Sequence, residues 1–429
     1  MNGLEVAGHR REELRVVVVG GGVIGICSAY FLSRRGVRVT VLERDEIGRG
    51  ASFGNAGLIS PGHPPINRPG RVRQAVRSMA DPLSPLYVEP RWDPQLVRWM
   101  WSFARHCSER HVEDGMSALS PLGRLTLELF QGLVEEERLD CGYRSSGYLE
   151  VFDTPSGLQA GRAEADVVAR HGFEPVFLDG EALREREPLL ADSVLGGWFH
   201  PEGRTVDPYR FVIELADRAV SRGAVVKPGA EVTGILARGG RVQGVRTAEG
   251  DVPADAVVVA TGAYSPELMA SLGCPLPIQA AKGYHSDRDP RTPGTPALTM
   301  PCLLGERSVF CSPLAGFVRF AGTLEFSGRN LELRRRRLDQ LDAAARRYFR
   351  GVEANEPLSE WCGLRPCSPD GLPVIGPVPG CGGAYVATGH AMLGLTLGPV
   401  TGALLAELVV EGSASLEIDA FSPGRFGRT

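Results

Sequence analysis

The fold of this chain is decided by one stretch near its N-terminus, Arg15-Val-Val-Val-Val-Gly20-Gly-Gly-Val-Ile-Gly25. The valine run is apolar at every position, which predicts a parallel strand covered on both faces. Over residues 23–35 apolar side chains recur at helical spacing, and Gly36 lies where a C-cap glycine belongs. Residues 37–42 have the pattern of a second strand. The stretch therefore predicts a strand, a helix and a second strand in succession.

The glycines of this stretch match the spacing G-x-G-x-x-G, and each has a physical task. Gly20 permits the tight turn, Gly22 lets a pyrophosphate approach the backbone, and Gly25 lets the helix pack close to the strand. The helix start offers free N–H groups and a positive dipole end to the phosphates. Glu43 follows the second strand, where a carboxylate accepts hydrogen bonds from both ribose hydroxyls and repels a 2′-phosphate. We predict a dinucleotide site that disfavours NADP; a solvated strand end is the alternative for Glu43.

Length, composition and charge limit the class of protein. A chain of 429 residues is long for one core, so we expect two domains. Apolar residues at 43% and charged residues at 23% are typical of a globular protein. The net charge of −4 gives no electrostatic footprint for nucleic acid. Histidines and cysteines do not cluster at ligand spacing, so we expect no metal, and the absence of a C-x-x-C pair indicates a reducing, cytoplasmic compartment.

Later parts of the chain repeat the strand-and-glycine pattern. Residues 44–70 lose periodicity and fill with Gly, Ser, Asn and Pro, and such long irregular segments are usually functional. The buried-strand pattern of residues 256–260 ends in Thr261-Gly262, far from the first junction. The nucleotide domain is therefore expected to be discontinuous. We also predict the following elements: helices over residues 94–109, 208–223, 331–350 and 400–410, a strand within 143–152, and a β-rich region over 275–330.

Four blocks carry a family resemblance: Glu43-Arg44, Gly50-Ala-Ser-Phe-Gly-Asn-Ala-Gly-Leu-Ile-Ser-Pro61, Gly363-Leu-Arg-Pro366 with Pro369-Asp-Gly-Leu-Pro-Val-Ile-Gly376, and Gly389-His-Ala-Met-Leu-Gly-Leu-Thr396. Together they resemble the FAD-dependent D-amino-acid dehydrogenases of the glycine/D-amino-acid oxidase superfamily. The resemblance implies an α/β protein. It has a discontinuous Rossmann-like FAD-binding domain and an α+β substrate domain built on a large mixed or antiparallel sheet.

The resemblance also divides the chain and implies a non-covalent FAD. The FAD-binding domain would comprise residues 14–68, 205–270 and 361–429. The substrate domain would comprise 69–204 and 271–360, after a flexible leader over 1–13.

The residues that the resemblance assigns to the cofactor lie in the same blocks. Val23 and Ile24 would lie at the pyrophosphate, Glu43 with Arg44 at the adenosine ribose, and Val232 at the adenine through its backbone. For the 50–61 block, a surface loop rich in small residues is the alternative. The other assigned positions are Ala51, Ser52, Asn55, Ala56, Gly57, Leu58, Thr261, Gly262, Gly363, Gly389, His390, Met392, Leu393, Gly394, Leu395 and Thr396.

Flavin oxidation of an amino acid removes the Cα hydrogen as hydride, which demands positioning of the substrate. Arg365 matches the family position whose guanidinium binds the substrate carboxylate bidentately. The alternative is a buried arginine paired with an acid such as Asp370. Residues 390–396 open onto the last helix, whose N-terminus would stabilise reduced flavin. Tyr284 and His63 are further candidates for the substrate site, with simple packing an equal alternative for each.

The leading hypothesis is a dehydrogenase that oxidises the CH–NH bond of a D-amino acid, or of a cyclic imino acid such as D-proline or hydroxy-D-proline, to the imine. Electrons would pass to a quinone or another carrier. An oxygen-using oxidase of glycine, sarcosine or D-amino acids is the close rival. A flavin-binding redox sensor or scaffold without turnover, or a nicotinamide-only dehydrogenase, is the alternative from another class.

The amphipathic stripe Trp99 to Phe103 bears on where the protein works. Core packing is the ordinary reason for such a stripe, and peripheral contact with the inner face of the membrane is the alternative. The sequence predicts no oligomeric state.

Overall fold

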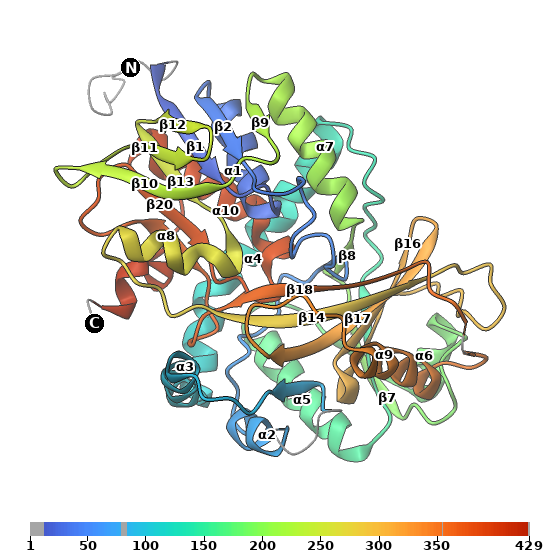
Figure 1. Cartoon of the computed structure of the whole chain (residues 1–429). Coiled ribbons are helices and arrows are strands. Elements are labelled where there is room, and N and C mark those ends of the chain that lie inside the picture. Colours follow the sequence, from blue (N-terminus) through green and yellow to red (C-terminus); the bar gives the residue numbers. More distant parts are fainter. Residues whose placement is uncertain (1–12, 79–83, 354, 428–429) are drawn as a thin grey trace.

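A six-stranded sheet forms the core of the first half of the molecule (Figure 1). The computed structural model describes residues 13–78, 84–353 and 355–427, so residues 1–12 of the predicted leader lie outside it. The strand order is β19-β20-β13-β1-β2-β9, and only β19 runs antiparallel to its neighbour. The strands span Arg15–Val19 (β1), Arg38–Leu42 (β2), Val225–Lys227 (β9), Ala256–Val259 (β13), Val374–Pro377 (β19) and Ala384–Thr388 (β20). The sheet is thus assembled from separate parts of the chain, in agreement with the prediction of a discontinuous nucleotide-binding domain.

The opening β-α-β unit agrees with the sequence prediction. The valines of β1 are almost fully buried, because the strand lies between β13 and β2 with both faces covered. Helix α1 spans Val23–Arg34, and Gly36 has a φ of +77° in the turn that follows it. A left-handed turn of this kind favours glycine because a side chain would be strained there.

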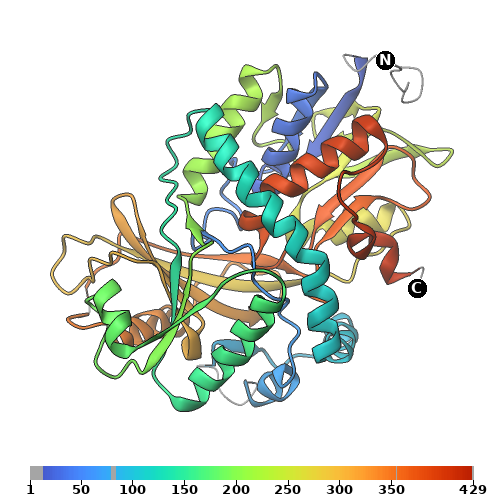
Figure 2. The same cartoon turned by 180° about the vertical axis from the view of Figure 1, so that it is seen from behind.

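Helix α10 (Gly394–Glu411) packs on α1 against one face of this sheet, and Figure 2 shows α4 (Glu109–Glu136) crossing the same side. The prediction of a helix over 400–410 was too short, since α10 begins six residues earlier despite Pro399 within it. Close packing decides the outcome: a Cβ on Gly402 would lie 2.5 Å from the backbone carbon of Cys27. Among the described residues, α10 alone is long and apolar enough to span a membrane, but 83% of it is buried in the protein.

A nine-stranded mixed sheet forms the second half of the molecule. Its order is β18-β14-β17-β16-β15-β5-β7-β6, with β4 added beside β17; the β15–β5 and β17–β4 pairs are parallel and the others antiparallel. Residue 361, where we predicted a domain boundary, lies inside β18. The strands span Leu86–Val88 (β4), Tyr148–Phe152 (β5), Val176–Asp179 (β6), Gly196–His200 (β7), Gln279–Arg288 (β14), Cys302–Leu304 (β15), Val309–Leu314 (β16), Phe317–Phe326 (β17) and Ser359–Cys367 (β18).

Helices and two small sheets complete the fold. The helix expected over 94–109 ends at Arg105, because Ser108 accepts a hydrogen bond from the His111 N–H and so caps the next helix. The remaining helices are α2 (Arg71–Ser78), α3 (Pro94–Arg105), α5 (Pro155–Arg170), α6 (Gly180–Arg186), α7 (Pro208–Ser221), α8 (Ser265–Ser271) and α9 (Arg335–Tyr348). The remaining strands are β3 (Leu58–Ile59), β8 (Arg204–Thr205), β10 (Val232–Arg238), β11 (Arg241–Thr247) and β12 (Gly250–Pro253).

Candidate active site

A cavity of about 1370 Å³ lies at the carboxyl ends of the parallel strands of the six-stranded sheet. Val19, Leu42 and Thr388, which end β1, β2 and β20, contribute to its wall. This edge is where open α/β sheets bind ligands, because backbone groups and helix N-termini converge there. On the far side, Ala321 and Leu303 of the nine-stranded sheet also line the cavity, so both halves of the molecule contribute to it.

The glycine turn after β1 packs against neighbouring backbone more closely than side chains would allow. Gly20 has a φ of +108°, and a Cβ there would lie 2.5 Å from the Ala260 carbonyl oxygen. Gly22 lines the cavity, and the atom nearest to a Cβ at that position is Ser52 Oγ at 3.3 Å. Gly25 does not line the cavity; a Cβ there would lie 1.9 Å from the Gly20 carbonyl oxygen. Gly25 therefore acts by letting α1 approach the turn, and not by direct contact with a ligand.

The ribose end of the cavity contains Glu43, Arg44 and Val232 together. The two carboxylate oxygens of Glu43 accept hydrogen bonds from the backbone N–H groups of Gly21, at 2.6 Å, and Asp45, at 2.9 Å. Each oxygen keeps a lone pair for a further donor such as a ribose hydroxyl. The Arg44 guanidinium lies 3.9 Å from the ring centroid of Tyr264, so this end is formed by residues far apart in sequence.

The 50–61 loop is held over the middle of the cavity. Arg319 of β17 donates hydrogen bonds to the carbonyl oxygens of Phe53 and Asn55, at 2.9 and 2.8 Å. Gly57, which we had assigned to the cofactor, does not line the cavity: its φ is +79° and a Cβ would lie 2.4 Å from the Val206 carbonyl oxygen. The turn at Gly57 instead directs the chain into β3. The other residues assigned in this loop line the cavity: Ala51, Ser52, Asn55, Ala56 and Leu58.

The N-terminus of α10 faces the cavity. Its Ncap residue, Leu393, provides no side-chain hydrogen bond to the first turn, so that turn keeps backbone N–H groups for a ligand. Residues assigned here that line the cavity are Met392, Leu393, Gly394, Leu395 and Thr396, together with His390 and, from other segments, Val23, Ile24, Thr261, Gly262 and Gly363. Gly389 does not line it; with a φ of +74°, it serves the turn.

His390 is unsuited to acid–base work. Its side chain is buried, and Nε2 lies 3.1 Å from the Thr401 hydroxyl oxygen. Burial lowers the pKa of the ring to about 3, so the imidazole is neutral at physiological pH. The neighbouring Ala391 has a φ of +47° and donates its N–H to the Pro366 carbonyl oxygen at 2.9 Å, which joins this turn to β18. The backbone of the turn, and not the imidazole, is what His390 brings to the site.

Arg365 of β18 lines the cavity with a guanidinium that has no protein partner among the described residues. The guanidinium lies over Gly283, where a Cβ would be 2.7 Å from one of its terminal nitrogens. The alternative pairing with Asp370 is wrong, because Asp370 forms an ion pair with Arg425 at 2.7 Å. Burial lowers the pKa of Arg365 from its ordinary value, and no carboxylate of the described residues forms an ion pair with it. A carboxylate ligand would supply the missing partner.

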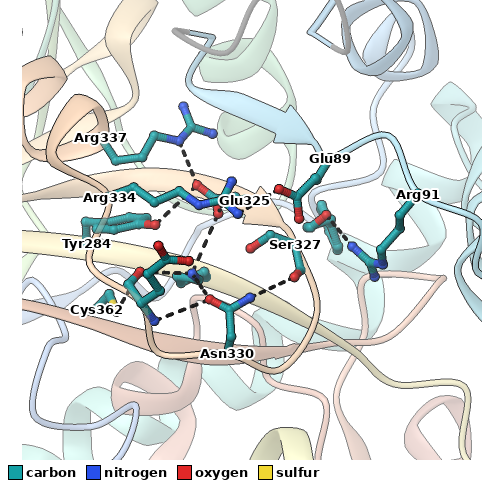
Figure 3. A network of polar contacts seen from close by, with 12 residues as sticks. Glu89, Arg91, Tyr284, Glu325, Ser327, Asn330, Arg334, Arg337 and Cys362 are labelled. Atoms are coloured by element: carbon teal, nitrogen blue, oxygen red, sulfur yellow. Dashed lines mark hydrogen bonds and ion pairs between the residues drawn. The ribbon is translucent and has the colours of Figure 1, made fainter.

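The structure does not bring Tyr284 to the cavity. Side chains alternate between the two faces of a strand. Arg365 covers Gly283 on one face of β14, so the side chains of Tyr284 and Lys282 lie on the other face, away from the cavity. Figure 3 shows the tyrosine in a buried polar network, where its hydroxyl donates to Glu325 Oε2 at 3.2 Å. The prediction of a substrate contact at Tyr284 is therefore wrong, and the residue is part of the packing behind the site.

That polar network supports one wall of the cavity (Figure 3). Lys282, which is fully buried, donates to Asn330 Oδ1 at 2.5 Å and to the Glu332 carbonyl oxygen at 3.1 Å. These bonds fix the segment after β17, from which Arg329 and Leu331 line the cavity.

His63 lines the cavity, as predicted for a site residue. Its Nδ1 lies 2.7 Å from the Pro64 carbonyl oxygen, a contact in which the ring nitrogen must be the donor. Burial and the nearby positive charge of Arg68 lower the pKa of His63, so the ring is neutral. Its role in the reaction stays a prediction.

Several cavity residues escaped the sequence analysis. Tyr148 and Glu150 come from β5, which we expected as a strand without assigning it to the site. A charged residue within an otherwise apolar strand was the signal that could have found Glu150. Others that line the cavity are Ser60, Arg68, Arg71, Glu164, Phe310 and Trp361.

Comparison with known proteins decides the family. A family model described as FAD dependent oxidoreductase matches residues 15–408. This chain belongs to that family. The predictions of an FAD-dependent enzyme and of the superfamily are confirmed.

Two curated relatives match nearly the whole length of this FAD-dependent oxidoreductase. The D-amino acid dehydrogenase of Sinorhizobium medicae is 34% identical over 95% of this chain and 98% of the relative. The D-amino acid dehydrogenase of Agrobacterium fabrum is 30% identical over 96% of this chain and 100% of the relative.

Solved structures agree on the fold. Glycine oxidase from Geobacillus kaustophilus superposes with a TM-score of 0.76 at 25% identity, covering 96% of this chain and 99% of that one. L-proline dehydrogenase from P. horikoshii gives a TM-score of 0.76 at 22% identity, covering 98% and 99%. The predicted combination of an α/β nucleotide-binding sheet and a large mixed sheet is confirmed.

The residues present fit an FAD. The turn at Gly20 packs so closely on the Ala260 carbonyl that a Cβ would overlap it, and Gly22 beside it lines the cavity. One continuous cavity then runs from Glu43, at the ribose end, to the N-terminus of α10 and to Arg365. A dinucleotide that carries a reactive ring at its far end requires this arrangement, with a pyrophosphate site in the middle and free N–H groups beyond it.

Proposed function

We propose that this enzyme oxidises the CH–NH bond of a D-amino acid, or of a cyclic imino acid of the D-proline type, to the imine. Electrons then pass to a quinone or another carrier. The unpaired guanidinium of Arg365 in the cavity carries the proposal, because a substrate carboxylate is the chemistry it lacks. Relatives named D-amino acid dehydrogenase, which match this chain over 98% and 100% of their own length, support the same substrate class.

The protein's own part in this reaction is to bind and orient. Arg365 forms two parallel hydrogen bonds to the substrate carboxylate, which sets the position of Cα. The N–H groups of the first turn of α10 stabilise negative charge that develops beside them. FAD, when bound, would accept the Cα hydrogen as hydride, with the two electrons of the Cα–H bond, while the substrate nitrogen loses a proton and the C–N bond becomes C=N. No acid–base role falls to His390, since it is neutral and buried.

Anaerobic mixing tests the substrate class. We expect D-amino acids to bleach the flavin absorbance of the purified holoenzyme, while their L-enantiomers and N-methyl glycines leave it unchanged. The readout is the visible absorbance of the flavin, at roughly 350 to 550 nm. Flavin that no amino acid bleaches would contradict the proposal and favour a redox sensor. The unpaired Arg365 argues against a sensor, which needs no carboxylate site.

A second step distinguishes a quinone from oxygen as the electron acceptor. After bleaching, a quinone analogue or air is admitted to the reduced enzyme. We expect fast reoxidation by the quinone analogue and slow reoxidation by air. Fast reoxidation by air alone would instead indicate an oxidase, as the name of the glycine oxidase that shares this fold states for that protein.

Peripheral membrane contact would bring a quinone within reach, and an exposed patch supports it. Trp99 of the predicted stripe is buried and donates its indole N–H to the Cys367 carbonyl oxygen. Trp92 and Trp101 are instead 91% and 63% exposed. Val72, Val76 and Val97 of α2 and α3 are exposed at the same end of the molecule (Figures 1 and 2). Exposed arginines accompany them, namely Arg73, Arg98 and Arg105.

Aromatic side chains beside arginines are typical of surfaces that lie on anionic lipid. We propose that this patch contacts the cytoplasmic face of a membrane, in keeping with the nine unpaired cysteines of a reducing compartment.

Replacement of Trp92 and Trp101 by serine tests this contact. We expect the wild-type enzyme to co-sediment with vesicles of phosphatidylglycerol and phosphatidylcholine. The double variant should lose roughly 10-fold or more of its affinity, because two aromatic anchors are removed from the interface. Both proteins should keep the same flavin content and the same rate with a soluble quinone analogue. Equal sedimentation of the two proteins would contradict membrane contact through this patch.

A further inference from the structure

The cavity has a polar end that the carboxylate site does not use. We call it the side-chain subsite and define it by the cavity residues Ser60, His63, Arg68, Tyr148, Glu150 and Glu164. Tyr148 and Glu150 are two residues apart on β5, so their side chains share the face of the sheet that lines the cavity. Burying this many polar groups costs free energy unless each finds a partner, so the partners show what the subsite still lacks.

Among the described residues, Glu150 has one weak polar partner, His200, and accepts no short hydrogen bond. It is 7% exposed and lines the cavity. Its nearest ion-pairing group is His200 Nε2, at 3.5 Å, and that nitrogen makes no hydrogen bond. The His200 ring is held by stacking on Tyr148, with ring centroids 4.5 Å apart and planes 5° from parallel. Burial and the negative charge of Glu164 raise the pKa of Glu150, while His200 and the positive charge of Arg68 act in the opposite direction.

The other groups of the subsite interact with one another. Glu164 forms an ion pair with Arg68, and Arg71 lies close enough to both to feel their charges. The Tyr148 hydroxyl is 3.3 Å from Ser60 Oγ. His63 is neutral and bonded to the Pro64 carbonyl oxygen. A ligand therefore meets one weakly partnered acceptor here, the carboxylate of Glu150, whose one ion-pairing neighbour among the described residues is His200.

Hydrogen bonds join this end of the cavity to Arg365 through the N-terminal turn of α10. On one side, the Ala391 N–H donates to the carbonyl oxygen of Pro366, which follows Arg365 in β18. On the other, the Ser60 N–H donates to Thr396 Oγ1 at 3.1 Å, and Ser60 also contacts Tyr148. Arg365 and Glu150 thus face one cavity from two sides of the same turn. An amino acid held by its carboxylate at Arg365 would have its side chain in the same cavity that Glu150 lines.

We propose that Glu150 recognises the substrate side chain and makes the cavity selective for D-amino acids with a cationic end, an ammonium or guanidinium. The inference rests on the proposed oxidation of D-amino acids and names the class of side chain within it. The cationic group would donate a hydrogen bond to the Glu150 carboxylate and bring a positive charge next to it. Apolar side chains leave that buried carboxylate with only the weak contact to His200, which disfavours their binding.

The test compares D-lysine with D-norleucine, which has a similar length but no ammonium. Rapid anaerobic mixing of the holoenzyme gives the dissociation constant and the flavin reduction rate separately. For the wild type we expect the reduction rate divided by the dissociation constant to be higher for D-lysine than for D-norleucine, so that the ratio of the two values exceeds 1. In Glu150→Gln the ratio should fall about 10- to 100-fold, the worth of a hydrogen bond to a charged group. The change should appear in the dissociation constant for D-lysine, with D-norleucine almost unaffected.

Glu185→Gln is the matched control, since Glu185 is an exposed carboxylate on α6 outside the cavity. Flavin content and thermal unfolding show that Glu150→Gln is folded, and Glu150→Asp, which keeps the charge on a shorter side chain, should retain part of the preference. An unchanged ratio in Glu150→Gln, or a wild-type preference for D-glutamate, would overturn this inference alone. Wild-type flavin that no D-amino acid reduces would overturn the proposed function and this inference with it.

Discussion

Replacing Arg365 by alanine is expected to lower kcat/KM for the amino acid substrate about 100- to 1000-fold. Removal of one partner from a buried charge pair costs about 3–4 kcal/mol, and each 1.4 kcal/mol is tenfold. The guanidinium has no other partner among the described residues, so its loss should fall on substrate binding and orientation, with little effect on folding. Steady-state kinetics with a D-amino acid, alongside the flavin content of each variant, gives the measurement.

Controls separate the guanidinium's geometry from its charge. Arg365→Lys keeps a positive charge but loses the planar fork, so we expect an intermediate loss. Added guanidinium chloride should restore part of the activity of Arg365→Ala, because Gly283 leaves space at this position. Arg346→Ala removes an exposed arginine of α9 and should change nothing. Arg365→Ala with kcat/KM within about fivefold of wild type, roughly 1 kcal/mol, would mean that the substrate carboxylate binds elsewhere.

Gly25→Ala is expected to give a protein without bound FAD and with lower stability. The new Cβ would lie 1.9 Å from the Gly20 carbonyl oxygen and 3.0 Å from its carbon. Both are backbone atoms of the pyrophosphate turn, so the overlap is relieved only if α1 moves away from the turn. Overpacking of this kind costs typically 1–3 kcal/mol. The ratio of flavin to protein absorbance after purification and the midpoint of thermal unfolding are the two readouts.

Gly234→Ala provides the comparison for this variant. Gly234 lies in β10, and a Cβ there would meet no atom within 4 Å. It should bind FAD and unfold like the wild type. If Gly25→Ala also retained full flavin content and an unchanged midpoint, the close packing of α1 on the turn would not be what forms the pyrophosphate site.

Local sequence signals were sufficient where one short segment builds the structure. The β1-α1-β2 unit follows from the valine run, the three glycines and Gly36, because each feature acts within a few residues. The prediction failed at Tyr284 for the opposite reason. Alternation along β14 separates its two faces, but which face meets the cavity depends on pairing with β18 and β17, which lie far along the chain.

Glu150 and α10 illustrate two further limits. β5 was expected as a strand, yet its partner β15 begins some 150 residues later, so nothing near Glu150 indicated a cavity. Propensity alone placed the start of α10 after Pro399, whereas packing of Gly398 and Gly402 on α1 extends the helix to Gly394. In both cases tertiary contacts decide the outcome. The cofactor residues were better predicted because they form contiguous blocks in sequence.

The order of strands in the six-stranded sheet has a consequence for how the chain is made. β1, β2 and α1 are synthesised first, but β19, β20 and α10 complete the sheet and cover α1 only with residues 374–411. Pairing over such sequence separation is slow, and it leaves apolar surface exposed on the nascent chain. We therefore expect the N-terminal β-α-β unit to be synthesised well before its last partners, β19, β20 and α10, can pack on it. The cavity is complete only when the turn at the start of α10 is in place, so we expect stable FAD binding late in folding.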